Sequence, residues 1–477
     1  TLEINRPVGV TNTTSVVIAT ALNILSGTYQ GSGSVTLNSG ATITRADGAV
    51  TKTITATSYN LVYTSTAAIF TGSELIVSPA TALNNLTINS SNTVTLNASL
   101  TSVTINGSLI LSAGQFSSNS KAIILRGNVI SNATGGFTGS LVTFGGTTAI
   151  SGVVPLVLDD VQLSSGSTIN LGSSTVNFTG DIDTDNGGTW LAGTSTVNFA
   201  GSTTIVINET NTPRFNHLNI ESSSTLIITC SSCGSDGNRP TIEVAGDWNS
   251  NNTSAVFTPA PDIASNVVTK VTFAGTTQSI STLPPHSFWD LTLAGSGTVT
   301  LFQALSVAND IELSGTKTLS TGSNLAINIG DDFLFSGGAL TANQSTITFN
   351  GTSNHDIDRL SGSGAVSFYN ITVNKAGGAF TVATDINLAS TFTISSATSV
   401  DFDGPSGTDL LTLISTSTQT ASIAPIVSPA DPTLVTGNIT AQRYMDGEGK
   451  IFRYISTPVL NPQAQDLQGE IPVTGSF

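Results

Sequence analysis

The chain has 477 residues, of which 38% are hydrophobic and only 9% are charged. Disordered chains show the opposite balance, so this composition predicts a folded core. The 14 basic and 30 acidic residues give a net charge of −16, which argues against nucleic acid and anionic membrane surfaces as partners. Thr, Val, Ile, Ser, Asn and Gly dominate and good helix formers are scarce, so we expect an all-β protein.

The apolar runs of the chain and its first residues bear on where the protein is located. No apolar run reaches about 18 residues, so no direct membrane span is predicted. The chain opens in strand-like sequence at Thr1–Asn5 without a signal peptide. From this we expect either that a leader has been removed or that the chain belongs to a longer polypeptide.

Short alternating strands follow one another along the chain. Apolar residues alternate with Thr or Asn in segments such as Leu86–Ile88, Val94–Leu96, Val103–Ile105 and Leu109–Leu111. A period of two predicts strands with one buried face and one wet face. Clusters of Asn, Gly and Ser separate these strands, as turns require.

One phrase recurs: a short strand that ends in Phe, followed by a small residue and Gly. A repeated phrase predicts one structural unit stacked many times. We expect its Phe to stack inside the fold as core and its Gly to turn the corner. Several copies lie about 75 residues apart, which predicts units of three coils with roughly 20–25 residues each. The phrase is found at Phe144, Phe178, Phe199, Phe273 and Phe349.

Two architectures fit short strands and frequent turns. A β-sandwich array needs hairpins and domains of about 100 residues, whereas a parallel β-helix stacks short strands coil on coil. Hairpin signals such as Asn-Gly between adjacent strands are rare, which favours the parallel β-helix. We therefore expect a β-solenoid over residues 1–424, a rod of about eighteen coils and roughly 90 Å at ~4.8 Å per coil.

The best candidate for a metal site lies within Gly180–Gly188. Asp181, Asp183 and Asp185 alternate there, so their carboxylates would share one face of a strand or wrap a tight loop. Calcium prefers several oxygen ligands of this kind. The segment departs from the EF-hand loop, because its Gly falls one position late and no Glu closes it. A solvated acidic turn is the alternative, and no other cofactor is predicted.

Cys230 and Cys233 are the only two cysteines of the chain. A redox motif with this spacing would begin a helix, and no helix is predicted nearby. A zinc site would need further soft ligands, and there is no second Cys-x-x-Cys. We expect a local disulfide that pins a protruding loop, with two unpaired thiols as the alternative.

Other titratable residues give weaker signals. Asp159–Asp160 and Asp331–Asp332 are adjacent pairs, whose members would point to opposite sides of a strand and so would not act together. His355–Arg359 gathers charge in an otherwise uncharged neighbourhood, where a solvated turn is the alternative to a site. His217 and His286 stand alone within strand phrases, and we interpret them as structural. No catalytic triad or nucleotide-binding motif is present, and we expect no enzyme.

The pattern changes near residue 424. Three prolines in eight residues mark a linker over 425–436. The segment 437–477 is richer in basic residues and closely spaced aromatics, and we expect it to begin a separate β-sandwich-like module and to leave it incomplete. Its phrases are Gly437-Asn-Ile-Thr-Ala-Gln-Arg-Tyr444, Phe452-Arg-Tyr454, Ser456-Thr-Pro-Val459 and Gln465-Asp-Leu-Gln468.

These tail phrases, together with upstream phrases such as Phe368–Gly378, resemble the large secreted β-solenoid surface proteins of gliding Bacteroidota-type bacteria. The resemblance covers residues 437–468 most specifically and the rest of the chain loosely. It implies export by type IX secretion, an extracellular location at the cell surface and an adhesin-like role. It supplies no catalytic residues.

We therefore expect a structural or adhesive stalk, or a filament segment. It would display or space other modules of the same longer chain or of a neighbouring surface protein, with weak contact to a polysaccharide or surface ligand. A β-helix polysaccharide lyase or hydrolase is the alternative. Exposed aromatics beside clustered carboxylates would support it, and the aromatics in question are Trp190, Trp248 and Trp289. A second alternative is an ice-binding rod with ranks of outward Thr, although the Thr triplets are irregular.

Overall fold

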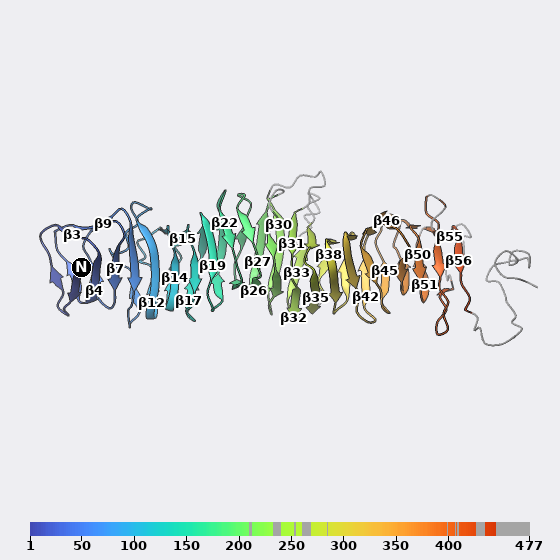
Figure 1. The fold of residues 1–477 in the computed structure, drawn as a ribbon, viewed down its shortest axis with the longest axis horizontal. Coiled ribbons are helices and arrows are strands. Elements are labelled where there is room, and N and C mark those ends of the chain that lie inside the picture. The colour runs from blue at the N-terminus through green and yellow to red at the C-terminus, as the bar shows by residue number, and fades with distance from the viewer. Residues whose placement is uncertain are drawn as a thin grey trace, which may run out of the picture.

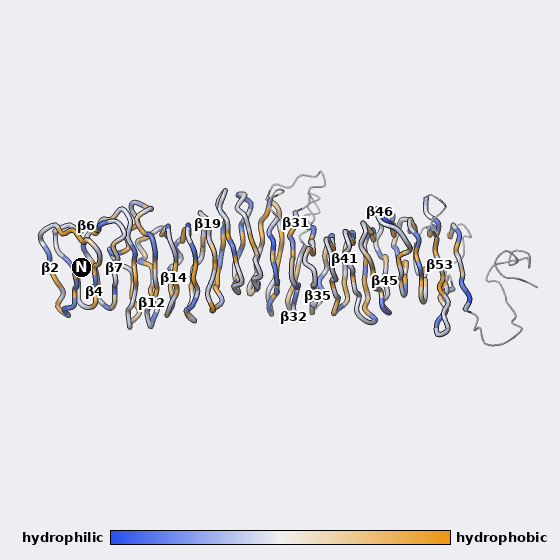
Figure 2. Tube along the Cα trace, in the orientation of Figure 1, coloured by the Kyte–Doolittle hydropathy of each residue, from blue (hydrophilic) through white to orange (hydrophobic). Residues whose placement is uncertain are grey.

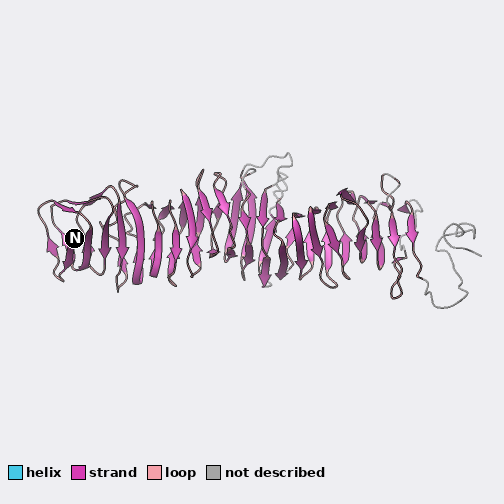
Figure 3. Cartoon of the chain, viewed as in Figure 1, coloured by secondary structure: helices cyan, strands magenta, loops and turns pink. Residues whose placement is uncertain are grey.

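The protein is a β-solenoid of about 18 turns built from parallel strands, as the composition and the strand pattern predict (Figures 1 and 3). The computed structural model describes residues 1–208, 212–231, 240–251, 254–259, 269–283, 285–397, 399–405, 407, 410–425 and 435–444. None of these residues forms a helix that is long and apolar enough to cross a membrane. The coils stack side by side along one axis, and the β1 coil lies at one end of the rod (Figure 1).

The rod has three faces, each a ladder of parallel strands one per coil. On the first face one sheet ends at β25 and the next begins at β28, and these two strands are in contact. Its strands are β1 (Leu2–Asn5), β4 (Ala21–Ser26), β7 (Ala41–Arg45), β10 (Tyr59–Tyr63), β12 (Leu83–Thr95), β14 (Leu109–Ser117), β16 (Val129–Ser131), β19 (Thr147–Ser151), β22 (Thr168–Asn170), β25 (Thr189–Leu191), β28 (Arg214–Phe215), β31 (Thr241–Val244), β34 (Lys270–Phe273), β37 (Asp290–Leu293), β40 (Ile311–Ser314), β43 (Phe333–Ser336), β46 (His355–Ser361), β49 (Ala379–Ala383), β52 (Ser399–Asp401) and β55 (Val435–Thr436).

The second face follows the first in the chain. It begins with a short three-stranded sheet, and the long strands β12 and β14 turn the corner and carry the ladder on to β17. Its strands are β2 (Val10–Thr11), β5 (Thr28–Gln30), β8 (Ala49–Val50), β11 (Ile69–Phe70), β17 (Gly136–Thr138), β20 (Leu156–Leu158), β23 (Thr175–Phe178), β26 (Thr196–Phe199), β29 (His217–Ile220), β32 (Trp248–Asn251), β35 (Thr277–Leu283), β38 (Ser296–Leu301), β41 (Thr316–Ser320), β44 (Ala339–Thr341), β47 (Val366–Phe368), β50 (Ile386–Leu388), β53 (Leu411–Leu413) and β56 (Ile439–Ala441).

The third face completes each coil. It too starts with a short sheet of three strands, and β33 is in contact with β36 where two of its sheets meet. Its strands are β3 (Val16–Ile18), β6 (Val35–Leu37), β9 (Ile54–Ala56), β13 (Ser102–Ile105), β15 (Ala122–Leu125), β18 (Leu141–Phe144), β21 (Asp160–Leu163), β24 (Ile182–Asp183), β27 (Ser202–Ile207), β30 (Thr225–Cys230), β33 (Val256–Pro259), β36 (Ser287–Phe288), β39 (Leu305–Val307), β42 (Ala326–Ile329), β45 (Thr346–Phe349), β48 (Asn370–Asn374), β51 (Thr391–Ser396) and β54 (Ser422–Ile423).

One continuous apolar core fills the space between the three faces. Figure 2 shows apolar and polar residues alternating along the coils, because every second side chain of a strand points inward. The predicted core residues Phe144, Phe178, Phe199, Phe273 and Phe349 are all fully buried. The rings of Phe178 and Phe199 stack on consecutive coils, with their centroids 6.1 Å apart.

The repeated phrase nevertheless does not mark a unit of three coils. Phe199 ends β26 on the second face, Phe273 ends β34 on the first face and Phe349 ends β45 on the third face. Eight strands separate β26 from β34, which is not a whole number of coils at three strands a coil. The phrase therefore describes a single strand and can occur on any of the three faces, because each face has inward positions that can hold Phe.

The glycine of the phrase has a reason that the sequence did not reveal. A side chain at Gly201 would collide with the carbonyl oxygen of Thr179, and one at Gly351 would collide with that of Gly330. Neither position has a left-handed backbone. The glycine is therefore required by the close approach of the preceding coil rather than by turn geometry.

The rod continues past the boundary expected at residue 424. Strand β55 pairs in parallel with β52, and β56 pairs in parallel with β53. Residues 435–441 were expected to belong to a linker and to a separate module, but in the structure they add strands to the first and second faces. Most of the expected linker and the rest of the expected module, 445–477, lie outside the described residues.

Candidate functional site

Asp and Asn side chains at the corners of the coils share one structural role. Their Oδ1 atom accepts a backbone N–H from the next coil, so the side chain closes a gap in the ladder between strands. This arrangement explains much of the Asn and Asp content without any ligand. The pairs are Asn85 with Ser108, Asn128 with Ala149, Asn132 with Val153, Asp160 with Asp181, Asp181 with Thr204, Asp247 with Ser279, Asn354 with Ala379 and Asn370 with Thr391.

On the first face this role produces a column of four carboxylates, one per coil, which we call the acidic column. It consists of Asp290, Asp310, Asp332 and Asp356, each directly before residues that pair across β37, β40, β43 and β46. The backbone N–H of each member donates to Oδ1 of the one before it, at 3.4, 3.0 and 2.8 Å. Like charges are thereby held one coil apart, about 4.8 Å.

A cluster of different chemistry lies at the C-terminal end of the acidic column. One ligand atom each from Asp331, Asp332 and His355 lies within 4.8 Å of the other two. The prediction that Asp331 and Asp332 point apart is wrong, because they occupy the corner before β43 and not a strand. His355 begins β46 on the next coil, so the cluster bridges two coils.

His355 is the unusual member of this cluster. Its side chain is 0% exposed, and its Nδ1 lies 3.1 Å from Oδ1 of Asp331. Neither ring nitrogen has a hydrogen-bond partner of good geometry. Burial, followed by the positive charge of Lys375, lowers the pKa of His355 to about 4, and nearby carbonyl groups of Asp331 and Gly351 act in the opposite direction. The imidazole is therefore neutral near pH 7.

Lys375 supplies the positive charge next to the cluster. It is buried and donates to the carbonyl oxygens of Ser353 and Ala379, the latter at 2.7 Å. Burial lowers the pKa of Lys375 to about 8, although Asp331, Asp332 and Asp356 oppose the shift. The ammonium group is thus held by backbone carbonyls and pairs only indirectly with the carboxylates.

Two carboxylates of the acidic column close to His355, those of Asp332 and Asp356, have raised pKa values. Burial raises the pKa of Asp332 to about 6, helped by the charges of Asp331, Asp310 and Asp356 and opposed by the N–H of Asp356. Burial also raises the pKa of Asp356, opposed by a hydrogen bond with Thr381 and by Lys375. Groups whose pKa values are displaced in this way mark a place where a cation or a proton would relieve stored repulsion.

The predicted calcium residues do not form a comparable cluster. Asp181 accepts the backbone N–H of Thr204 at 2.7 Å, and Asp183 accepts the side-chain amide of Gln162 at 3.0 Å. Asp183 also accepts the N–H of Asp185 at 3.1 Å, as in an acidic turn, and its contact raises the pKa of Asp185. Among the described residues, the group of three or more that could share an ion is Asp331, Asp332 and His355.

The cysteine prediction can be followed at one of its two residues. Cys230, at the end of β30, is disulfide-bonded, in agreement with the expected bridge. Cys233 lies outside the described residues. No free cysteine is found in the described part of the chain.

The aromatic residues that would support an enzyme are mostly buried. Trp190 and Trp248 belong to the core, where Trp248 donates its indole N–H to Nδ1 of His286 at 3.1 Å. Trp289 is half-buried. His286 is likewise buried, as its structural interpretation requires, whereas His217 is partly exposed and lies 3.2 Å from Asp247.

Polar ladders cover parts of two faces. On the second face, side-chain amides of consecutive coils hydrogen-bond to one another at 2.7–3.2 Å. This asparagine ladder consists of Asn177, Asn198, Asn219 and Asn249. On the third face, β39 to β51 present a rank of half-buried hydroxyl and amide groups in register: Ser306, Asn328, Thr348, Thr372 and Thr393.

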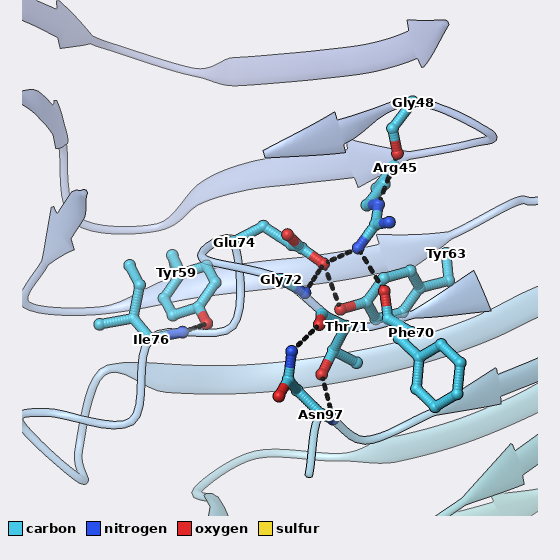
Figure 4. A network of polar contacts seen from close by, with 10 residues as sticks. All are labelled: Arg45, Gly48, Tyr59, Tyr63, Phe70, Thr71, Gly72, Glu74, Ile76 and Asn97. Carbon is cyan, nitrogen blue, oxygen red and sulfur yellow. Dashed lines mark hydrogen bonds and ion pairs between the residues drawn. The ribbon is translucent and has the colours of Figure 1, made fainter. Parts of the chain in front are cut away.

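A second charged group is buried near the N-terminal end of the rod (Figure 4). Arg45 and Glu74 form an ion pair, with side chains 7% and 0% exposed. Oε1 of Glu74 also accepts from Tyr63 at 2.9 Å and from the N–H of Gly72 at 2.8 Å, while Arg45 donates to the carbonyls of Gly48 and Phe70. We call this the arginine–glutamate network.

Neither protein-family models, nor curated proteins, nor solved structures give a match to the chain.

Proposed function

We propose that the protein is a rigid extracellular rod that spaces or displays other modules, as a stalk or a segment of a fibre. The observation that carries this proposal is the continuity of the three faces. Their parallel pairing runs from Leu2 to Ala441 over about 18 turns around one core. At ~4.8 Å per coil, such a stack reaches roughly 90 Å.

Stiffness follows from how the coils are joined. Each coil is hydrogen-bonded to the next on one or more of the three faces, and corner side chains such as Asp160 and Asn128 add bonds between coils. Because every repeat contacts its neighbours, bending the rod would strain bonds on all three faces. A rigid rod of this kind holds the modules at its two ends at a fixed distance and needs no conformational change.

The surface fits weak contact with polysaccharide. The hydroxyl and amide rank on the third face is uncharged and repeats once per coil, as a polymer of sugars does, and side chains of this type both donate and accept hydrogen bonds. The resemblance of the tail to secreted surface proteins supports a cell-surface location and export by type IX secretion. The ice-binding alternative would use the same rank, in which Thr occupies three consecutive coils, at Thr348, Thr372 and Thr393.

The spacing proposal is tested by changing the number of coils. Thr175, Thr196 and His217 are in register, so deleting residues 175–216 removes two coils and rejoins the chain in phase. We expect a folded rod whose maximum dimension, measured by small-angle X-ray scattering, falls by about 10 Å. Deletion of 175–206 would join Ser174 to Ile207 on the wrong face, and it serves as the matched control that should not fold.

Display is tested on intact cells that carry the chain on their surface. Antibody accessibility of a tag placed beyond residue 477 should fall when residues 175–216 are removed. Accessibility that does not depend on coil number would contradict a spacing role. Glycan-array binding that is lost on Thr348→Val and Thr372→Val substitution would add the adhesive role.

A polysaccharide lyase or hydrolase is the second candidate, favoured by the cluster of Asp331, Asp332, His355 and Lys375 with displaced pKa values. Against it, His355 and Lys375 are buried and could not touch a polymer directly. Incubation with a panel of polysaccharides, read by reducing ends and by unsaturated products, tests this candidate. Cleavage that is lost with Asp331→Asn but kept with Asp181→Asn would replace the spacing role by catalysis.

A further inference from the structure

The cluster at Asp331, Asp332 and His355 is not explained by the structural role of the other corner carboxylates. Oδ1 of Asp332 accepts the N–H of Asp356 at 2.8 Å, as expected for a member of the acidic column. Asp331 is outside the column, and its side chain is 26% exposed. His355 is fully buried beside these two carboxylates, with Nδ1 3.1 Å from Oδ1 of Asp331, and neither ring nitrogen makes a hydrogen bond of good geometry. A buried imidazole normally has a partner.

The charge balance around the imidazole favours a cation. The carboxylates of Asp310, Asp332 and Asp356 are stacked on consecutive coils, and Asp331 lies beside them. One ammonium group, that of Lys375, faces this group, and its Nζ is held by the carbonyls of Ser353 and Ala379. Four carboxylates opposed by one ammonium leave a net negative field at the corner.

We propose that Asp331, Asp332 and His355 bind a divalent transition-metal ion, with zinc as the best fit. Carboxylate oxygen and imidazole nitrogen are both donor types that zinc accepts, at about 2.0–2.2 Å from the metal. The ligand atoms lie within 4.8 Å of one another, so small side-chain rotations would bring them to these distances. Calcium fits less well, because it prefers six to eight oxygen ligands and does not favour imidazole.

The bound ion would join two adjacent coils. Asp331 and Asp332 lie in the corner before β43, and His355 begins β46, which pairs with β43. An ion held by both coils stabilises the folded rod by mass action, because the unfolded chain does not bring the three ligands together. The exposed side of Asp331 leaves room for water as a fourth ligand, as three-residue zinc sites commonly have.

The alternative explanation is a purely structural pair, in which His355 packs in the core and Nδ1 contacts Asp331 at 3.1 Å. A matched pair exists on the surface, where Nδ1 of His217 lies 3.2 Å from Oδ2 of Asp247. No third ligand joins this surface pair among the described residues. It therefore serves as the control for a simple histidine–aspartate contact.

The experiment uses the full chain after treatment with a chelator. Isothermal titration with Zn²⁺ should show one saturable site, and Co²⁺ should produce the visible absorption of a four- or five-coordinate ion. His355→Gln and Asp331→Asn should each weaken binding by ~10-fold or more, since each removes a ligand. His217→Gln should leave binding unchanged. Circular dichroism of each variant checks the fold, and the exposed position of Asp331 makes its variant the safer of the two.

Several outcomes would overturn the proposal. These are the absence of a saturable Zn²⁺ site in the folded wild-type chain, a site that survives Asp331→Asn and His355→Gln unchanged, equal loss of binding in His217→Gln, and tighter binding of Ca²⁺ than of Zn²⁺. Support requires both the single site and its loss on substitution. Zn²⁺ should also raise the unfolding temperature of the wild type and not that of Asp331→Asn.

Discussion

The arginine–glutamate network and the cluster at Asp331, Asp332 and His355 both bury charge in the same fold, but they differ in how that charge is balanced. In the network, Glu74 receives the guanidinium of Arg45 and two further donors, Tyr63 and Gly72, on one oxygen (Figure 4). In the cluster, the imidazole of His355 faces two carboxylates and has no hydrogen bond.

The charges of the network therefore serve the structure, whereas the cluster has excess negative charge and is able to take up a cation. In the buried ion pair the charge is balanced although Oε2 of Glu74 has no hydrogen-bond partner, and removing one member of the pair leaves an uncompensated charge. A buried neutral base beside crowded carboxylates is incomplete, and an added cation would improve it. What identifies His355 as the candidate ligand is a combination: neither ring nitrogen of this buried imidazole makes a hydrogen bond of good geometry, and its ligand atom lies within 4.8 Å of those of two carboxylates.

The largest effect is expected from breaking the network. Arg45→Met keeps the apolar stem of the side chain but leaves Glu74 charged and buried at 0% exposure. We expect a loss of about 3–5 kcal/mol in the free energy of unfolding. Urea denaturation followed by circular dichroism measures it.

Two variants set the scale for that loss. Arg214→Ala removes a surface ion pair to Glu243, whose N–O distance is 2.9 Å and whose partners are 52% and 29% exposed, and should change stability by less than about 1 kcal/mol. Asp331→Asn in the open cluster leaves a neutral imidazole and should also have a small effect in the absence of metal. Equal losses in Arg45→Met and Arg214→Ala would show that the network is not a closed structural unit.

A pH dependence is expected from His286, the buried histidine that does have a partner. Its Nδ1 accepts the indole N–H of Trp248 at 3.1 Å, and burial lowers its pKa to about 4. Between pH 6.5 and 4 the unfolded chain binds a proton that the folded rod does not, so stability is lost as the pH falls through this window. The loss attributable to His286 is on the order of 3 kcal/mol.

Unfolding curves at a series of pH values, read by tryptophan fluorescence, measure this effect. His286→Gln keeps an acceptor for Trp248 but does not titrate, so its stability should fall less over the same window. Other groups titrate there too, and for this reason the quantity of interest is the difference between wild type and variant. An unchanged slope in His286→Gln would mean that the folded rod accepts the proton on His286 without penalty.

The fold could be predicted from the sequence because it depends on local patterns. Period-two alternation gives strands, and short strands with frequent turns favour stacked coils over hairpins. The pattern also contained information that the prediction did not use. In Ala41–Arg45 the inward positions are 41, 43 and 45, and in β46 the inward positions include His355. Strict application of the alternation would have placed both charged or polar side chains inside the rod.

The candidate site could not be predicted because it depends on register between coils. Asp332 and His355 are 23 positions apart in the sequence, and which residue of one coil meets which of the next depends on corner lengths that vary. The same variation explains why the Phe phrase occurs on all three faces rather than on one. Of the carboxylates clustered in sequence at Asp181–Asp185, those of Asp181 and Asp183 proved to accept backbone N–H groups.

The smallest effects are expected from two single substitutions, Asn to Asp in the asparagine ladder and Asp to Asn in the acidic column. In the asparagine ladder, Asn198 donates to Asn177 at 2.8 Å and accepts from Asn219 at 2.7 Å. Asn198→Asp keeps the acceptor but removes the donor, so the folded rod should lose about 1 kcal/mol. In the acidic column, Asp310→Asn keeps the oxygen that accepts the N–H of Asp332 and removes one like charge. It should gain about 0.5 kcal/mol.

The opposite signs are what make this pair informative. If carboxylates in the acidic column served only to accept backbone N–H groups, an amide would do as well, and the column would gain from losing charge. The gain should shrink as salt concentration rises, because screening weakens repulsion between partly exposed carboxylates. Zinc should reduce this gain: with Zn²⁺ present, Asp310→Asn should gain less, since a bound cation at Asp331, Asp332 and His355 already relieves the repulsion in the wild type. A gain in stability that is the same with and without Zn²⁺ would show that charges in the acidic column do not interact with an ion at the proposed site.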